Sequence, residues 1–280
     1  MGAKRLQKKY IRYEWLQMQK AEQKFLQENV NTKIYRWQEA VEKRVPEKLE
    51  ETLRTAFYKA FEAIFEKGSG MIEKTCAKER RKYNYKVHEY AAKIRGNRKS
   101  LQAFQREANA GRAANLALSA VEGVGMGVLG MGIPDIPVFL AVLLKNIYEI
   151  ALSYGFSYDT EEEQIFILRL IETALSHGED LTGRNMELNL WIYRKENQML
   201  EMQEVPVESD ISKEEQIRRT ANELAGELLY LKFVQGLPVI GIAGGISDVV
   251  YQKKISQYAQ LKYQRRFLEH QRMKKDFSNI

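Results

Sequence analysis

Apolar side chains recur at steps of three and four residues along most of this chain, a spacing that places them on one face of an α-helix. The first clear run consists of Val30, Ile34, Trp37, Val41 and Val45. A second run follows Pro46 and consists of Leu49, Leu53, Phe57, Phe61, Ile64 and Phe65. No periodic segment has the two-residue period of a strand. The sequence therefore predicts an all-α protein with a single multi-helix domain.

Capping residues, glycines and prolines set the expected helix bounds. We expect a basic amphipathic helix over residues 3–45, broken near Asn29 and Asn31. A basic N-terminal helix or arm is expected at 1–40, followed by the helical domain at 41–275. Within that domain, Ser212 with Glu215 three residues later is a capping box that predicts a helix start. The helices expected after the first are 46–67, 71–95, 100–122, 145–154, 161–177, 184–200, 212–235 and 249–275.

Residues 123–144 form a glycine-rich apolar segment with the length of a membrane span. Pro134, Asp135 and Pro137 interrupt it, so neither side offers the roughly 20 unbroken apolar residues that a spanning helix needs. We expect a helical hairpin buried in protein. A second glycine-rich turn, GLPVIGIAGGISD, carries the same Gly-Ile-x-Asp pattern, which indicates two similar hairpins and leaves an internal duplication and chance both open. The glycines and prolines of these hairpins are Gly127, Gly130, Gly132, Pro134, Pro137, Gly241, Gly244 and Gly245.

Residues 125–130 satisfy the G-x-G-x-x-G spacing of a dinucleotide-binding turn. That turn must follow a strand and open a helix, whereas an alanine-rich helix is expected before this one. Close packing between helices is the better explanation for its glycines. We therefore expect no bound cofactor.

The net charge of +7 is distributed unevenly. Residues 1–100 carry 25 Lys and Arg against 13 acids, and residues 101–200 carry 7 against 13. Basic ends around an acidic middle suit an anionic membrane surface or an acidic partner such as a transporter subunit. Nucleic acid is a weaker candidate because no recognition motif is present. The expected surface-binding residues are Lys4, Arg5, Lys8, Lys9, Arg12, Lys253, Lys254, Arg265 and Arg266.

One cysteine, Cys76, and three histidines exclude an internal disulfide and a Cys/His zinc site. We expect no metal and a cytoplasmic location, peripheral at the inner face of the membrane. Asp135 and Asp248 are the weak catalytic candidates, with Glu122 near the first of them in sequence. Two such carboxylates side by side could hold a cation or act as acid and base, whereas each alone could cap the helix that follows it. Capping is favoured.

The segment GMGVLGMGIPDIPVFLAVLLKNIYEIALSYGF, followed by EEEQIFILRLIETAL, resembles the EcsC family of bacterial proteins. The matching positions are Gly127, Gly130, Gly132, Asp135, Pro137, Tyr154 and Gly155. The later glycine-rich turn is similar to the closing segment of the family, and the likeness covers about residues 41–269. It implies a helical accessory protein of the cytoplasm or membrane, connected with an ABC exporter, and it assigns no catalytic residue.

Three functions therefore follow as expectations. The first is a non-enzymatic accessory protein that docks on the cytoplasmic membrane face or on an ABC exporter. The alternative is a hydrolase or metal-assisted enzyme built on Asp135 and Asp248. The third is a helical nucleic-acid-binding protein.

Overall fold

The computed structural model describes residues 2–30, 47–66, 81–82, 84–89, 99, 102–109, 135–201, 211–234 and 246–276. These residues form helices and short connections without any strand, which confirms the all-α prediction. The labelled helices are α1 (Gly2–Asn29), α3 (Glu47–Glu66), α7 (Asp135–Ser153), α8 (Glu161–Leu175), α9 (Gly178–Glu201), α10 (Lys213–Val234) and α11 (Ile246–Asp276).

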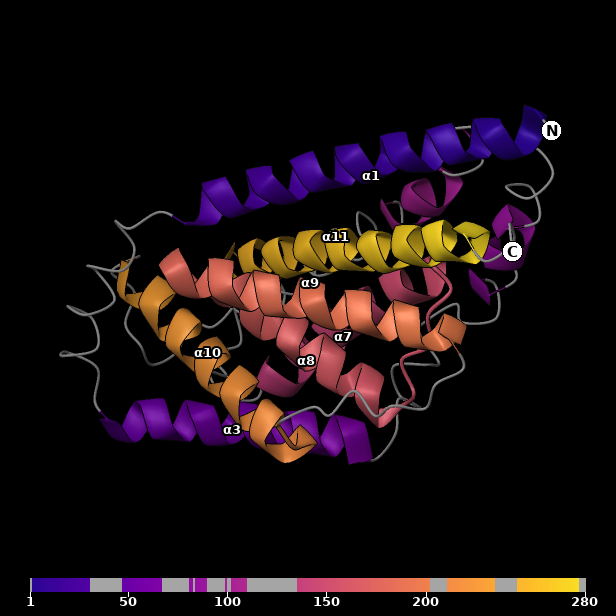
Figure 1. The fold of residues 1–280 in the computed structure, drawn as a ribbon. Helices are drawn as coiled ribbons and strands as arrows, with labels where there is room; N and C mark the ends of the chain where they lie inside the picture. Colours follow the sequence, from indigo (N-terminus) through magenta and orange to yellow (C-terminus); the bar gives the residue numbers. More distant parts are fainter. Residues whose placement is uncertain are drawn as a thin grey trace.

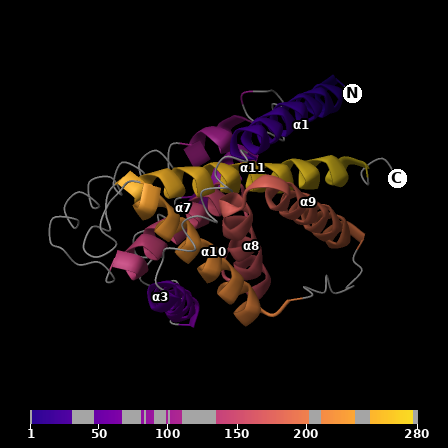
Figure 2. The ribbon, with the colours of Figure 1, turned by 90° about the vertical axis from the view of Figure 1, so that its left-hand side faces the viewer.

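Helix α11 runs through the middle of the fold and packs against α1, α7, α8 and α9. On the side away from α1, α10 packs against α8 and α3, and α3 also contacts α7. Figure 1 and Figure 2 both show α1 along one edge of the molecule and α3 along the opposite edge. One apolar core joins buried residues from all the labelled helices.

Several helix ends follow from local chemistry. Thr160 caps α8 by accepting a hydrogen bond from the Glu163 amide at 3.2 Å. Ser212 accepts from the Glu215 amide at 3.2 Å and so caps α10 as the capping pattern predicts. Helix α1 ends at Asn29, where the sequence predicts a break.

The C-terminal end of α7 requires a glycine. Gly155 has a φ of +86°, in the left-handed region that residues with a Cβ rarely adopt. Its amide donates to the Leu152 carbonyl and the Phe156 amide donates to the Ala151 carbonyl, which is the Schellman arrangement. A Cβ at Gly155 would also lie 2.3 Å from the Tyr85 ring. The predicted stop at Gly155 is therefore confirmed.

Two helix ranges differ from those expected. Helix α7 begins at Asp135, the carboxylate expected to stand before a helix, so the expected range 145–154 is too short; Pro137 lies in its first turn. A proline there costs no hydrogen bond, because the first amides of a helix have no carbonyl partner within it. Helix α9 begins at Gly178 rather than near residue 184, immediately after α8 ends at its cap Ser176.

None of the helices in the described ranges combines the length and the apolar composition needed to cross a membrane. The predicted glycine-rich hairpins fall mostly on residues 123–134 and 236–245, which lie outside the described residues. The hairpins therefore stay a prediction.

Candidate functional site

A buried ion network joins α11 to α1 and α9. The ammonium of Lys262 contacts the Glu22 carboxylate of α1 and donates to Asn185 Oδ1 and Asn189 Oδ1, each at 2.6 Å. Arg265 contacts the other oxygen of Glu22. Lys262 has no exposed side-chain surface, so the network lies inside the fold. It holds α1 in place through charge as well as apolar packing.

A second buried network lies one turn further along α11. Arg266 Nη1 is 2.8 Å from both carboxylate oxygens of Glu163 on α8, and its Nε is 3.3 Å from Glu196 on α9. Its guanidinium also lies 4.2 Å from the Phe156 ring centroid and 4.6 Å from that of Phe166. Carboxylates and aromatic faces both stabilise a buried guanidinium. Arg266 therefore connects α11 to α8 and α9.

The networks change the proton affinities of their members. Burial raises the pKa of Glu22, but Lys262 and Arg265 outweigh it and bring the pKa to about 2. Burial lowers the pKa of Lys262 to about 8 although Glu22 opposes the change. Burial would lower the pKa of Arg266, yet Glu163 and Glu196 raise it above its ordinary value. The carboxylate of Glu22 is thus ionised at neutral pH.

These contacts divide the charges of α1 between its two faces. Glu22 faces α11, and Glu14 accepts a hydrogen bond from Gln102 at 3.1 Å; both carboxylates are buried. Over residues 8–27 of α1 these are the only acids. The exposed charged side chains in that stretch are all basic: Lys8, Lys9, Arg12, Lys20 and Lys24. We call these five residues, with the exposed Tyr13 and Leu16, the outer α1 face.

The expected surface-binding residues separate into two groups. Lys8, Lys9, Arg12 and Lys253 are exposed as expected. The side chains of Lys4 and Arg5 lie outside the described part. The expectation is wrong for Arg266, which is buried, and Arg265 is largely turned into the Glu22 network. Lys254 is half-buried, and burial lowers its pKa.

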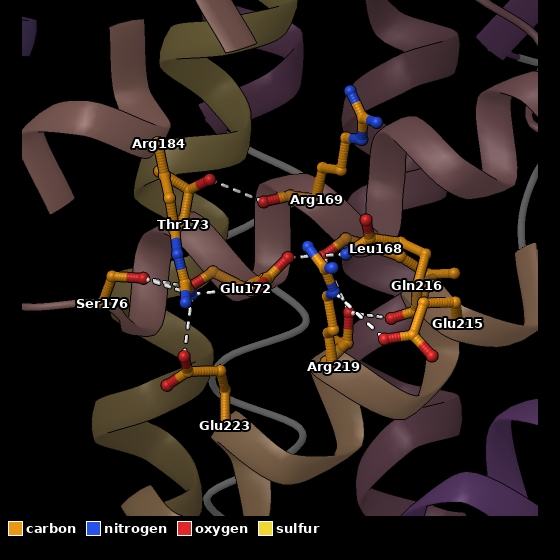
Figure 3. A network of polar contacts seen from close by, with 11 residues as sticks. Leu168, Arg169, Glu172, Thr173, Ser176, Arg184, Glu215, Gln216, Arg219 and Glu223 are labelled. Carbon is orange, nitrogen blue, oxygen red and sulfur yellow. Dashed lines mark hydrogen bonds and ion pairs between the residues drawn. The ribbon is translucent and has the colours of Figure 1, made fainter. Parts of the chain in front are cut away.

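A cleft of about 930 Å³ lies between α8, α9 and α10. Figure 3 shows the Arg184 guanidinium between Ser176, Glu172 and Glu223. Arg184 Nη1 is 2.9 Å from Ser176 Oγ, 3.1 Å from Glu172 Oε1 and 2.7 Å from Glu223 Oε1. Gln216 donates to the other Glu172 oxygen at 2.6 Å. Arg184 therefore cross-links the three helices that form the cleft.

The cleft carries charges of both signs. Burial raises the pKa of Glu223, against the effect of Arg184. In Figure 3 the Arg169 side chain extends away from the Arg184 contacts. The described lining residues include Thr173 and several carboxylates but no histidine, cysteine or serine. No sequence motif pointed to this cleft, because its three helices contribute isolated charged residues.

The catalytic candidates are only partly within the described residues. Asp135 begins α7 and Asp248 lies in the first turn of α11, but neither side chain is in the described part. Glu122 and the hairpin glycines Gly127, Gly130, Gly132, Gly241, Gly244 and Gly245, with Pro134, lie outside it altogether. The remaining signature residue, Pro137, is exposed.

The described side chains contain no group of three that could hold a metal ion. The alternative of an enzyme built on these carboxylates stays a prediction.

Comparison with known families gives a match over residues 9–268 to the model of the EcsC protein family. The chain belongs to the EcsC protein family. No curated protein and no solved structure matches it. The EcsC match begins at residue 9 and therefore includes most of α1. The resemblance seen in the sequence began only near residue 41. The boundary at residue 40 stays a prediction, while α1 packs on α11 and α9 of the EcsC fold.

Proposed function

We propose that this EcsC protein is a non-enzymatic accessory protein that docks reversibly on the anionic cytoplasmic face of a membrane. The observation that supports the proposal is the division of charge on α1, which turns its acids inward between residues 8 and 27 and its five cations outward. This division gives α1 a basic outer surface, on which Lys24 also lies 3.7 Å from the exposed Glu28.

The outer α1 face also suits the interface between water and lipid. Tyr13 and Leu16 are 38% and 48% exposed and lie between Arg12 and Lys20 in sequence. An interfacial helix places apolar and aromatic side chains at headgroup level while its lysines and arginines contact lipid phosphates. Because α1 forms an edge of the molecule, its outer face can approach a flat surface (Figure 2).

The strength of such docking follows from the number of cations. Each Lys or Arg near an anionic surface contributes about 1 kcal/mol, so several cations together give reversible binding that added salt weakens. The resemblance stated for the glycine-rich segment adds the second part of the proposal, a membrane-bound exporter as the partner at that surface.

Cosedimentation with vesicles tests the proposal. The unmodified protein should sediment with phosphatidylglycerol vesicles at low salt, and less with phosphatidylcholine vesicles or at high salt. The variant Lys9→Glu/Lys20→Glu should weaken binding to the anionic vesicles by at least about tenfold. The matched control is Lys48→Glu/Lys59→Glu, which makes the same change in charge on exposed residues of α3, at the opposite edge of the molecule.

Equal binding to both vesicle types would contradict membrane docking by charge. An equal loss in the α3 control would show that net charge, rather than the outer α1 face, controls the association.

A further inference from the structure

A second hollow, a groove of about 330 Å³, lies between α1, α11 and the helical residues 102–109. Two contacts hold 102–109 against these helices. Phe104 and Phe267 of α11 have ring centroids 4.5 Å apart, and Gln102 Nε2 donates to Glu14 Oε1 of α1 at 3.1 Å. The groove is therefore bounded by three segments that are far apart in the sequence.

Amide side chains dominate the lining of this groove. The chain as a whole is 29% charged, yet Glu14 is the one ionisable residue among the described lining residues. Met18, Ala21 and Leu261 supply an apolar part. The remaining lining residues are all amides: Gln17, Gln102, Gln105, Asn109, Gln257, Gln260 and Gln264.

Six of these amides form two matching ladders. On α11 they are Gln257, Gln260 and Gln264, separated by three and then four residues. The segment 102–109 has the same separations, in the set Gln102, Gln105 and Asn109. Residues three and four apart lie on one face of a helix, so each segment presents a row of amides to the groove.

The inner part of the α11 ladder is buried. Gln260 and Gln264 are only 6% and 7% exposed. Gln260 Oε1 is fully removed from solvent and unpaired. A buried amide without partners lowers the stability of a fold, because it gives up hydrogen bonds to water. The carbonyl oxygen of Gln260 would therefore gain a hydrogen bond if its side chain turned toward a ligand in the groove.

We propose that this groove binds a small neutral saccharide. A hydroxyl group donates and accepts at one oxygen, so it can bond the N–H of one amide and the carbonyl of another. The apolar lining residues would contact the C–H face of the sugar ring. An anionic ligand would find no cationic side chain among the described lining residues. The volume is at the small end for ligand sites, which suits one or two sugar rings.

The saccharide could be free or could be the headgroup of a glycolipid, and two experiments distinguish these sources. Calorimetric titration of the full-length protein with glucose and with maltose tests the free form. Cosedimentation with phosphatidylcholine vesicles that contain diglucosyldiacylglycerol tests the headgroup. Because these vesicles are neutral, the result does not depend on charge-driven docking by the outer α1 face.

The variants are chosen to separate binding from folding. Gln260→Leu should weaken saccharide binding at least tenfold and leave the melting temperature unchanged or higher, because it removes a buried carbonyl oxygen that has no hydrogen-bond partner. Gln257 lies at the exposed rim of the groove. The variant Gln257→Ala should therefore fold normally and weaken saccharide binding at least threefold. Gln27→Leu, an exposed glutamine of α1 outside the groove, is the matched control and should bind as the unmodified protein does.

Absence of binding to both the free sugars and the glycolipid would overturn the proposal. Undiminished binding by Gln257→Ala would also overturn it, even if Gln260→Leu did not fold. A large loss of stability in Gln260→Leu with unchanged sugar binding would show that the ladders bond to each other instead.

Discussion

Lys262 on α11 and Glu22 on α1 form a buried ion pair between positions 240 residues apart in the sequence. A pair of this kind favours one arrangement of the helices when both partners are present. Removal of one partner destabilises the fold, because the other charge stays buried without a counter-ion. In this fold the pair also determines which face of α1 is left for other molecules.

Replacing Glu22 by Gln should therefore destabilise the protein strongly. Lys262 would remain buried without its counter-ion, and the loss of a buried partner costs about 3–5 kcal/mol. Urea unfolding measures the change. The control Glu28→Gln affects the exposed pair with Lys24, 3.7 Å apart, and should cost less than about 0.5 kcal/mol. Similar losses in the two variants would contradict the burial of the Glu22 pair.

The carboxylate of Glu22 should also make the stability of the protein depend on pH in the acid range. The pKa of Glu22 is about 2 in the folded protein against 4.5 ordinarily, so the unfolded state takes up the proton first as the pH falls. Its contribution, about 3 kcal/mol, is complete above pH 4.5 and is lost as the pH falls toward 2. The difference in unfolding free energy between the unmodified protein and Glu22→Gln should shrink across this range. A difference independent of pH would refute this assignment.

Substitution of Gly155 by Ala should destabilise the end of α7. The left-handed conformation costs a residue with a Cβ about 1–2 kcal/mol, and the new Cβ would overlap the Tyr85 ring. Thermal unfolding measures the effect. Gly183→Ala is the opposite case, because nothing lies within 4 Å of a Cβ at that helical position. It should stabilise the protein by about 0.5–1 kcal/mol. Equal effects at the two glycines would disprove the turn geometry.

Replacing Arg184 by Gln should loosen the packing of α8, α9 and α10. The change removes charged contacts to Glu172 and Glu223, each worth about 1.5–3 kcal/mol when buried and less here because Arg184 is partly exposed. The loss should be smaller at pH 4 than at pH 7, since burial raises the pKa of Glu223 and its neutral form needs the cation less. Arg194→Gln, on the same cleft, is the control and should change stability by less than about 0.5 kcal/mol.

Part of the fold and of the site was predictable from local pattern. The periodicity over residues 49–65 and the cap at Ser212 each depend on residues within one turn, and the structure confirms them. A local signal for the network existed too, since Glu14 and Glu22 fall on the apolar stripe of α1 that contains Ile11, Met18 and Phe25. A charge on such a stripe indicates a buried partner without identifying it.

The sequence by itself determined the helical character of the chain, the cap at Ser212 and the excess of basic residues at the N-terminal end. Only the tertiary structure decided which cations are exposed. Arg266 and Lys262 lie in a helix as polar as any surface helix, yet they are buried because α1, α8 and α9 bring carboxylates and amides to them. The physical reason is the separation along the sequence over which each interaction acts. Helical periodicity and capping act between residues three or four apart, whereas the surroundings of a charge depend on which helix faces meet after the whole chain has folded.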